Sequence, residues 1–485
     1  MTKNVKSLFL GITLLSGLLF AQEDTTVQNT KQSDSLQQEL ENLKGKLNGL
    51  EESYLETKTT VDKLKKIKIS GYVQTQIRVA ADTSGQVSKE YKNNYDIGEF
   101  QGGKLPAITR SVFQVRRARL KLGYETSLSQ MYIQLDCLPF TTGNAVNDVS
   151  QVTDSTKKVS TKTAAFLSGS GVSLKDAYFK FNDPWTKSIG LRMGVFDRPF
   201  GYEISYSSSS RESPERSRVF QTLFPGERDL GIAIEYLPSD NLPAWAQHFN
   251  LKSGLFAGNG INVEFDDIRD IIGRIGFTLP LNNINMSIDG GFSGYYGHVR
   301  DRDSSLFKIV NNEWVGTKGH KWEHIGRQYV GGDLELYYGN IPFFGGISLR
   351  GEYISGQQPG TSSSSVSQKS DIANSSPVYV RNFSGFYGMA VLNIDPIKCQ
   401  LVGKYDVYDP NTDVDGQNQV KMAADMKYST VGTGLVYHIL ENVKLMAYYD
   451  IVKNEHMNET SAAKTPWLSK ELNDNVFTLR VQYKF

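Results

Sequence analysis

Five arginine residues lie in a single stretch, residues 198–228, together with serine, proline and aromatic residues. A guanidinium group is a planar fork of N–H donors that pairs with two oxygens of a phosphate or a carboxylate. If this stretch folds into a channel, it narrows the channel and presents positive groups to anions. The alternative is a surface loop with internal salt bridges, because the stretch also contains four acids. The arginines are Arg198, Arg211, Arg216, Arg218 and Arg228, and the acids are Glu203, Glu212, Glu215 and Glu227.

A second candidate is the run from His320 to His324, which with Glu323 matches the H-x-x-E-H pattern of some zinc peptidases. That chemistry needs a helix that places both imidazoles on one face. Glycines at 316, 319 and 326 flank the run and favour a loop. No nucleophile elbow or phosphate-binding glycine loop occurs in the sequence, so we predict that the chain is not an enzyme and needs no cofactor. An outer-membrane hydrolase remains the hypothesis that this run would serve.

Asn411, Asp413 and Asp415, followed by Gly416, resemble the start of a calcium loop. The twelfth position is Met422 where a bidentate glutamate is needed, so this is a weak calcium candidate, and a plain acidic turn is the alternative. No other metal site is predicted. Cys137 and Cys399 lie on different predicted strands, and the sequence does not show whether they pair.

Most of the chain after residue 66 alternates apolar and polar side chains with a period of two. Ile67, Ile69 and Val73 alternate with Lys68 and Gln74, for example. The runs extend over about 9–12 residues, the length of a tilted membrane strand, whereas strands of soluble proteins average about five or six residues. We therefore predict an all-β fold, a transmembrane antiparallel barrel of about 16 strands, with 14 or 18 as alternatives. The predicted strands are 67–80, 111–126, 130–140, 172–183, 188–197, 229–238, 248–257, 269–280, 285–297, 327–340, 344–356, 382–394, 398–408, 427–439, 443–453 and 473–485.

The predicted connections alternate between short turns and long hydrophilic loops, which is typical of outer-membrane barrels. The last strand ends on Phe485, with Phe477, Leu479, Val481 and Tyr483 on the same face. A terminal aromatic residue on an alternating strand is also typical of this class. Closing the sheet is necessary because lipid cannot satisfy the backbone groups of a free edge.

If the apolar faces meet lipid, the polar faces line a water-filled pore, and the sign of its charges selects among ions. The predicted pore-lining cations are Arg117, Arg119, Lys121, Lys180, Arg192, Arg274, Arg350 and Lys404, with Arg78 and Arg480 on the same faces. The predicted acids of the pore are Asp136, Asp176, Glu235, Asp289, Asp333, Glu335 and Glu352.

The N-terminal residues predict three segments before the barrel. Residues 1–21 contain two lysines, an apolar stretch and Ala21, which is the pattern of a cleavable signal peptide. Residues 22–34 are polar and are predicted to be flexible. Residues 35–66 place leucines such as Leu40, Leu43, Leu47 and Leu50 at spacings of four and three. This heptad run predicts a coiled coil, and a single amphipathic helix is the alternative.

The charge balance limits the partners. With 53 basic and 52 acidic residues the chain lacks the positive surplus that nucleic-acid binding needs, so no nucleic acid is predicted as a partner. The predicted partners are outer-membrane lipid, small anionic solutes, further copies of the chain in a homotrimer, and a periplasmic or cell-wall contact through residues 35–66.

Several motifs together resemble the phosphate-selective porin O/P family of Gram-negative outer membranes. They are 116–120 (RRARL), 191–196 (LRMGVF), 198–201 (RPFG), 225–231 (PGERDLG) and 256–260 (FAGNG). The resemblance runs in order over about residues 67–485. It implies a trimeric barrel with 16 strands, an inward third extracellular loop at 198–228, and anion uptake through basic pore residues.

The sequence therefore predicts an outer-membrane porin for passive diffusion of small solutes, favouring anions such as phosphate, with the arginine-rich loop as its constriction. The alternative from another class is a structural or binding barrel that is tethered through its coiled coil and has adhesive surface loops.

Overall fold

The structure is a computed structural model that describes residues 28–80, 98–103, 105, 110–137, 171–239, 242–262, 264, 266–300, 305–319, 323–365, 377–463, 466–472 and 474–485. The predicted signal peptide at 1–21 lies outside the described residues. The chain divides into two compact units between Lys66 and Ile67, and each is described by itself.

The first unit contains the helix α1, Gln28–Leu64. The helix begins inside the segment 22–34, for which the sequence analysis predicted flexible structure. The leucines of the heptad run are exposed, with 54% of Leu40, 65% of Leu47 and 69% of Leu50 accessible to solvent. An unpaired apolar seam of this kind is what a partner helix would cover. None of the described helices is both long enough and apolar enough to cross a membrane.

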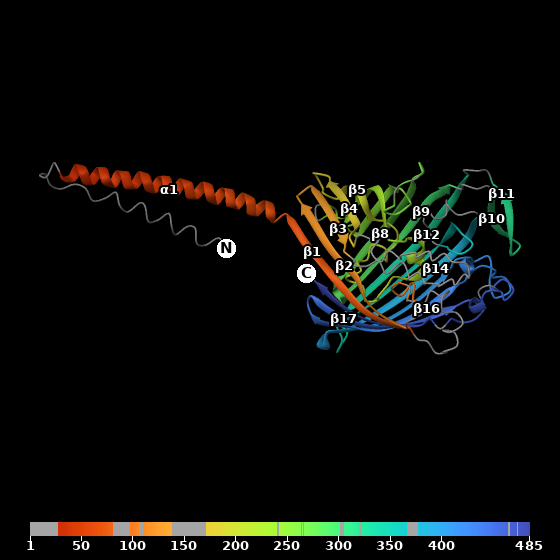
Figure 1. Cartoon of the computed structure of the whole chain (residues 1–485). Coiled ribbons are helices and arrows are strands. Elements are labelled where there is room, and N and C mark those ends of the chain that lie inside the picture. Colours follow the sequence, from red (N-terminus) through yellow and green to blue (C-terminus); the bar gives the residue numbers. More distant parts are fainter. Residues whose placement is uncertain are drawn as a thin grey trace, which may run out of the picture. The chain divides into compact units, whose positions relative to one another are not determined.

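The second unit is a closed antiparallel barrel of sixteen strands, in which β1 pairs with β2 on one side and with β18 on the other (Figure 1). This confirms the predicted fold. The barrel strands are β1 Ile67–Ala80, β2 Ser111–Glu125, β3 Ser129–Asp136, β4 Ser173–Asn182, β5 Ile189–Asp197, β6 Arg228–Tyr236, β7 Phe249–Phe256, β8 Asp270–Leu281, β9 Met286–Arg300, β12 His324–Gly339, β13 Gly346–Gly360, β14 Val378–Ile394, β15 Cys399–Asp409, β16 Tyr428–Leu440, β17 Val443–Asn454 and β18 Val476–Lys484.

Two further strands, β10 Ser305–Val310 and β11 Glu313–Lys318, form a hairpin in the connection between β9 and β12. The sequence analysis placed a loop at 298–326 and missed this hairpin. The strands are short. β10 forms a two-residue parallel pairing with the start of β14, and its Leu306 packs in one apolar cluster with Val299 of β9 and Ile325 of β12. The short helices are α3 Arg218–Leu223, η1 Ala246–His248, η2 Asn282–Ile284, η3 Asp395–Ile397, η4 Ala423–Asp425 and η5 Pro466–Ser469.

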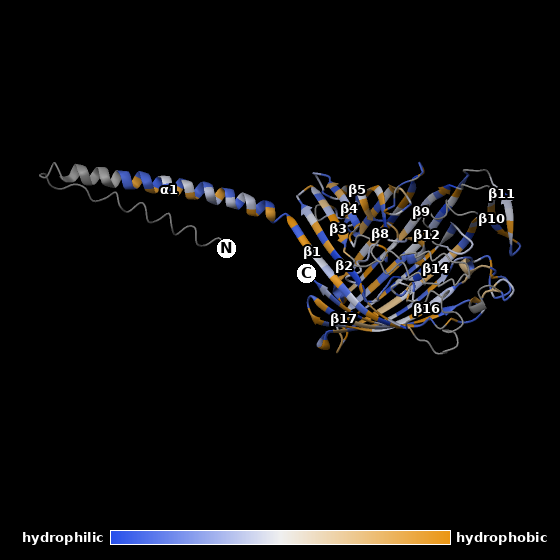
Figure 2. Cartoon of the chain, viewed as in Figure 1, coloured by the Kyte–Doolittle hydropathy of each residue, from blue (hydrophilic) through white to orange (hydrophobic). Residues whose placement is uncertain are grey.

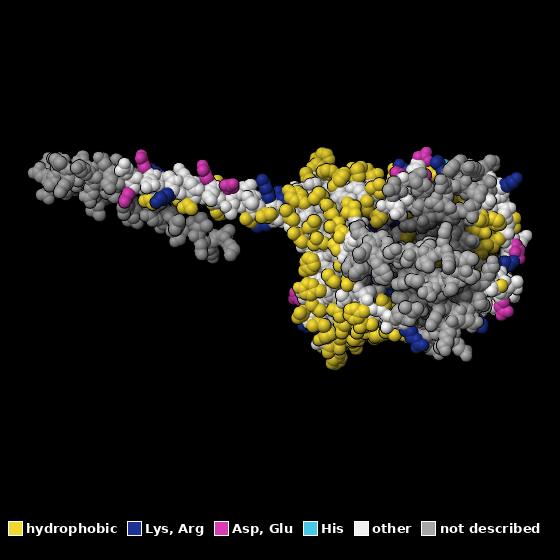
Figure 3. Space-filling model, viewed as in Figure 1, with side chains coloured by type: hydrophobic (Ala, Val, Ile, Leu, Met, Phe, Trp, Pro, Cys, Tyr) yellow, Lys and Arg dark blue, Asp and Glu magenta, His cyan; other side chains and the backbone are white. Residues whose placement is uncertain are grey.

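Side chains alternate between the two faces of the wall, as the period of two requires. On β1, Tyr72, Gln74 and Arg78 are buried on the inner face, while Val73 and Val79 are exposed on the outer face. The alternation is visible as striped colouring along the strands in Figure 2. On the outside, exposed apolar side chains gather over the part of the barrel wall that is visible in Figure 3.

The barrel closes where the chain ends. Gly71 and Phe485 exchange two backbone hydrogen bonds of 3.0 Å each. The ring of Phe485 lies directly over Gly71, because a Cβ atom at residue 71 would come within 2.6 Å of it. A glycine is therefore required at this point for the terminal aromatic side chain to lie against the wall.

Candidate functional site

The connection between β5 and β6, residues 198–227, contacts the inner faces of strands on opposite parts of the barrel. Gly201 N–H donates to Ser293 of β9 at 2.8 Å, and the Ser208 hydroxyl bonds Tyr72 of β1 at 2.6 Å. Glu212 accepts both Nη groups of Arg350 on β13, at 2.8 and 3.0 Å. The loop therefore lies within the barrel and spans its interior.

One side of this loop, the aromatic edge, consists of Phe220 and Phe224 with the rings that they touch. Phe224 is fully buried and its ring centroid lies 6.0 Å from that of Tyr295 on β9 and 5.9 Å from that of Tyr329 on β12. Phe220 packs edge-on against Tyr387 of β14 at 6.2 Å. These aromatic contacts form the core of a large apolar cluster inside the barrel. Burial of such rings is the main stabilising contribution on this side.

The other side, the charged edge, is built on Glu215. Its carboxylate oxygens accept Arg116 at 2.9 Å and Arg117 at 2.6 Å from β2, and Arg480 at 2.9 Å from β18. Burial alone would raise the pKa of Glu215, but these guanidinium groups hold that pKa well below its ordinary value. Glu215 is therefore ionised at neutral pH.

A local irregularity explains how two consecutive arginines reach the same carboxylate. The pairing of β1 with β2 shifts by one residue at Gln74, which pairs with Arg117, whereas Thr75 pairs with Val115. Arg116 is thus the extra residue of a β-bulge, and a bulge can redirect a side chain to the other face. A strict period of two would place Arg116 outward, so the sequence analysis missed it.

Two further cations complete the charged edge. Lys444 of β17 donates to the backbone oxygens of Ser209 and Arg211 at 2.9 Å each, and forms no ion pair among the described residues. Arg211 is only 3% exposed, and none of its three guanidinium nitrogens has a hydrogen-bond partner in the described part of the chain. Burial, with Arg216 and Arg117 nearby, lowers the pKa of Arg211 well below its ordinary value. We call Arg116, Arg117, Arg211, Lys444, Arg480 and Glu215 the basic cluster.

The other four arginines of the predicted constriction are engaged. Arg198 lies 3.2 Å from Asp229, and Arg228 lies 2.9 Å from Asp176. Arg216 pairs with Glu227 and also donates to three backbone oxygens. The guanidinium of Arg218 lies between the rings of Phe100 and Tyr428, with centroid distances of 4.1 and 3.3 Å.

The acids of the loop bind mainly the barrel wall, so the internally bridged surface loop is not what forms. Glu203 accepts Lys404 of β15 at 2.9 Å, and Glu227 accepts Lys175 of β4 at 2.8 Å. Burial opposes ionisation of both, and the neighbouring cations nevertheless lower the pKa of each.

Most predicted pore-lining cations likewise meet an acid on the inner face. Arg119 lies 3.0 Å from Asp136, and Arg274 lies 2.5 Å from Asp333. Glu235 pairs with two cations, Lys180 at 2.9 Å and Arg192 at 3.0 Å. Lys121 instead lies 5.8 Å from the centroid of the Tyr72 ring.

The predicted acids of the inner face also have partners. Asp289 accepts a hydrogen bond from Thr278, Glu335 lies 3.0 Å from Arg350, and Glu352 accepts backbone N–H groups of the loop. Arg78 donates to backbone oxygens of residues 98–103.

The remaining sequence candidates do not assemble into a site. His324 is the first residue of β12, so its segment is a strand, and His320 lies outside the described residues. Asn411 donates to Asp425 at 3.0 Å and Asp413 accepts Asn382 at 2.9 Å, which engages two of the three calcium candidates. Cys137 and Cys399 are free thiols. No group of three or more His, Cys, Asp or Glu side chains placed for a metal occurs in the described ranges.

The barrel is similar to solved structures of outer-membrane proteins. OprB of Pseudomonas putida matches with a TM-score of 0.51 and 10% identity over 88% of this chain and 96% of that chain. The outer membrane channel DcaP of Acinetobacter baumannii matches with a TM-score of 0.46 and 14% identity over 86% and 97%. The trimer form of OmpT, an outer membrane protein of Vibrio cholerae, matches with a TM-score of 0.44 and 10% identity over 86% and 99%.

At these identities the likeness to OprB shows the fold alone. No family model matches the chain, and no curated protein sequence is significantly similar to it.

Proposed function

We propose that the chain is an outer-membrane porin, a water-filled channel for passive diffusion of small solutes that favours anions such as phosphate. Loop 198–227 would be its constriction, and the inner-face cations would line the path. The sequence pattern and the resemblance to the phosphate-selective porins support three parts of the proposal. These are export by a signal peptide, the outer-membrane location and the preference for phosphate.

The observation that carries the anion preference is the imbalance of the basic cluster. It contains five cations and a single carboxylate, Glu215, on the inner face and the adjoining loop. A surplus of fixed positive charge beside a wet path attracts anions and repels cations. Arg211 adds three buried guanidinium nitrogens that have no hydrogen-bond partner within the described chain. An anion in transit is a group that these donors could bind.

The outer wall supports the membrane part of the proposal. Large apolar side chains such as Phe292, Leu334 and Val431 are 71%, 48% and 48% exposed on the outside of the barrel. Water would make this exposure costly, whereas lipid makes it favourable. We further propose that three chains associate, with α1 contributing through its exposed leucine seam.

Recording in planar lipid bilayers tests the function. The full chain should give stepwise conductance and a zero-current potential of anion-selective sign in a salt gradient. One charge about 8 Å from a passing ion in water changes the energy of that ion by about 0.5 kcal/mol, and salt screening over one Debye length reduces this to about 0.2 kcal/mol. The effect has opposite signs for anions and cations, so Arg211→Gln should lower the anion-to-cation permeability ratio about twofold. Lys421→Gln is the matched control. This partly exposed loop lysine pairs with Glu313, and neither residue belongs to the basic cluster.

Three outcomes would each contradict one part of the proposal. Absence of stepwise conductance would remove the channel, and preference for cations would remove the anion selectivity. An unchanged ratio in Arg211→Gln would remove the assignment of that arginine.

A second function, a structural or binding barrel, is favoured by the packing of loop 198–227 against the inner wall along its aromatic edge. In that case the interior is plugged and no conductance is expected. Deletion of residues 22–66 separates the two functions. A porin should lose only oligomer stability, which cross-linking measures, whereas a tethered barrel should lose its attachment to the cell wall.

A further inference from the structure

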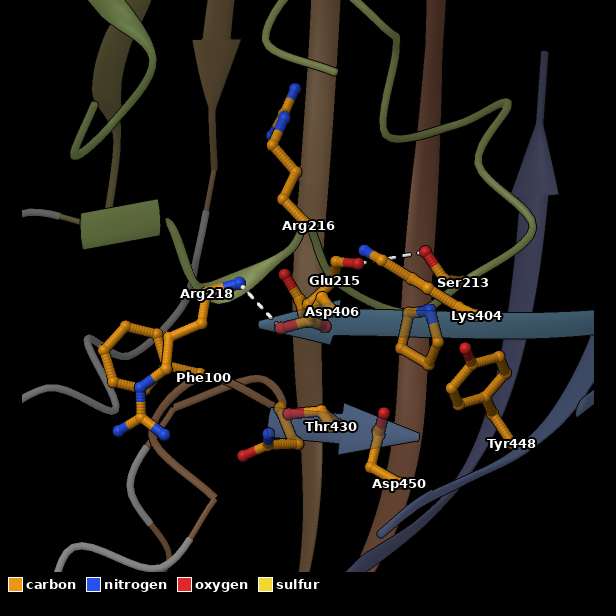
Figure 4. Close-up of a pocket in the computed structure, with 12 residues that line it drawn as sticks. Phe100, Ser213, Glu215, Arg216, Arg218, Lys404, Asp406, Thr430, Tyr448 and Asp450 are labelled. Atoms are coloured by element: carbon orange, nitrogen blue, oxygen red, sulfur yellow. Dashed lines mark hydrogen bonds between the residues drawn. The ribbon is translucent and has the colours of Figure 1, made fainter. Parts of the chain in front are cut away.

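A small cavity lies between the loop and the wall strands β15, β16 and β17 (Figure 4). Its volume is about 20 Å³. A space of roughly 10–15 Å³ holds one water molecule on this measure, so the cavity fits a single water or a single small ion. The lining residues that matter here are Lys404, Asp406, Tyr448 and Asp450 from the wall and Arg216 and Arg218 from the loop.

The three cations of the lining are all engaged away from the cavity. Lys404 donates its ammonium group to Glu203 at 2.9 Å. Arg216 pairs with Glu227, and Arg218 lies between two aromatic rings. Figure 4 shows the guanidinium groups of Arg216 and Arg218 extending away from the carboxylate of Asp406. None of these groups forms an ion pair with Asp406 or Asp450.

Two wall carboxylates are left without a cation partner in the described residues. Asp406 is 7% exposed, and its only hydrogen bond there comes from the backbone N–H of Arg218 at 3.5 Å. Asp450 forms neither an ion pair nor a side-chain hydrogen bond with the described residues. The third acid of the lining, Glu215, is held by three arginines. Two neighbouring negative charges, one buried and one half-buried, with no ion-pair partner are unfavourable.

The hydroxyl of Tyr448 is an independent sign of a missing ligand. Tyr448 is 2% exposed, lines the cavity, and its Oη has no hydrogen-bond partner in the described chain. Its ring lies flat on β16, because a Cβ atom at Gly432 would come within 2.2 Å of that oxygen. A buried hydroxyl oxygen normally has a partner, so this one points to a group that occupies the cavity.

We propose that the cavity binds a single Ca²⁺ ion, with Asp406 and Asp450 as charged ligands and the Tyr448 hydroxyl as a neutral ligand. All three supply hard oxygen atoms, which Ca²⁺ prefers, and its double charge balances both carboxylates. Mg²⁺ fits less well, because it demands near-ideal octahedral geometry, whereas Ca²⁺ accepts irregular geometry and bidentate carboxylates. With only two carboxylates, the affinity should lie in the weak range of extracellular calcium sites, about 10⁻⁴–10⁻³ M.

This inference goes beyond the proposed channel, because diffusion does not need a metal. With the ion bound, the wall at β15 and β17 is neutral. Without it, the negative charge that the two carboxylates carry is uncompensated and reduces the positive field of the basic cluster. Calcium would therefore set how strongly the path favours anions.

Calorimetric titration of CaCl2 into the full chain folded in detergent tests the site. One saturable binding event is expected, weakened at least tenfold in Asp450→Asn and clearly weakened in Tyr448→Phe, which keeps the ring and removes only the ligand oxygen. The difference in gel migration between heated and unheated samples reports folding. It should be the same in every variant as in the unmodified chain.

Two matched controls locate the binding. Asp289→Asn removes a different inner-face carboxylate, on β9, and Asp413→Asn removes a calcium candidate of the loop after β15. Both should bind as the unmodified chain does. Absence of binding, binding retained in Asp450→Asn, or loss in Asp413→Asn would each overturn the proposal. The readout does not require channel activity, so it fails or succeeds independently of the proposed function.

Discussion

At its aromatic edge, loop 198–227 packs Phe220 and Phe224 on tyrosines of β9, β12 and β14, whereas at its charged edge Glu215 meets arginines of β2 and β18. Aromatic packing is not directed at any solute and is little affected by salt. The charges of the charged edge have a field that extends beyond their direct contacts and is screened by salt. The aromatic edge therefore holds the loop in place, and we expect the charged edge to act on a passing solute.

The two edges also differ in what they tolerate. Along the aromatic edge a lost ring leaves a cavity, and the cost depends on how far the neighbours can relax. Along the charged edge a lost partner leaves an uncompensated buried charge. Stability and selectivity should therefore respond to different substitutions, and the predictions below test that separation.

The largest effect on stability is expected from Phe224→Ala at the aromatic edge. The side chain is fully buried against Phe200, Tyr295 and Tyr329, and removal of such a ring costs about 3–5 kcal/mol. Urea unfolding in detergent should measure that loss, and the permeability ratio should not change. Phe343→Ala, at a ring that is 91% exposed, is the control and should have little effect. A large change in selectivity with Phe224→Ala would contradict the separation of the two edges.

The second effect is expected from Glu215→Gln at the charged edge. Three guanidinium groups lose their shared carboxylate, so we expect a cost of about 3 kcal/mol in unfolding free energy, together with a roughly twofold gain in anion preference. The pKa of Glu215 is depressed, so its stabilisation is present above the unfolded pKa of about 4.3 and is lost as the pH falls through the lower folded pKa.

Unfolding curves of the two chains should therefore converge in acid and separate at neutral pH. Glu313→Gln is the matched control, because Glu313 is a largely exposed partner of Lys421 and such pairs contribute little. A parallel loss at all pH values would show that the carboxylate acts through its shape rather than its charge.

The barrel and its inner faces could be predicted because both follow from a period of two over long runs. Ile67 to Ala80 and Val476 to Lys484 each carry the pattern without interruption, and all sixteen predicted strands overlap barrel strands of the structure. The hairpin β10–β11 was missed because its strands have only six residues each. The pattern there is too short to distinguish from a loop.

The contacts of the site could not be predicted in the same way. Arg116 reaches Glu215 only because of a bulge, which the period of two hides. Lys444 lies on a predicted strand, but nothing in its sequence neighbours indicates the backbone oxygens that it meets. The five loop arginines look equivalent in the sequence, and only their partners in space distinguish Arg211 from the rest. Whether the named residues act on a solute stays a prediction.

The smallest effect on stability is expected near Arg218, the first residue of α3. This residue lies between Glu215 of the charged edge and Phe220 of the aromatic edge in the sequence. Asp474, in the loop before β18, lies near this arginine, and burial raises the pKa of Asp474 to about 7, although Arg218 opposes the shift. A carboxyl whose folded pKa exceeds its unfolded value of about 3.9 is unfavourable when ionised, so stability falls as the pH rises from about 4 through 7.

Asp474→Asn should abolish that fall, which we expect to be about 1–2 kcal/mol because a loop can relax and admit water. Asp415→Asn, at an exposed loop carboxylate, should leave the pH dependence unchanged. If Asp474→Asn kept the full fall in stability with pH, the titrating group would be another carboxyl with a raised pKa, because Glu215, whose pKa is depressed, gives the opposite dependence.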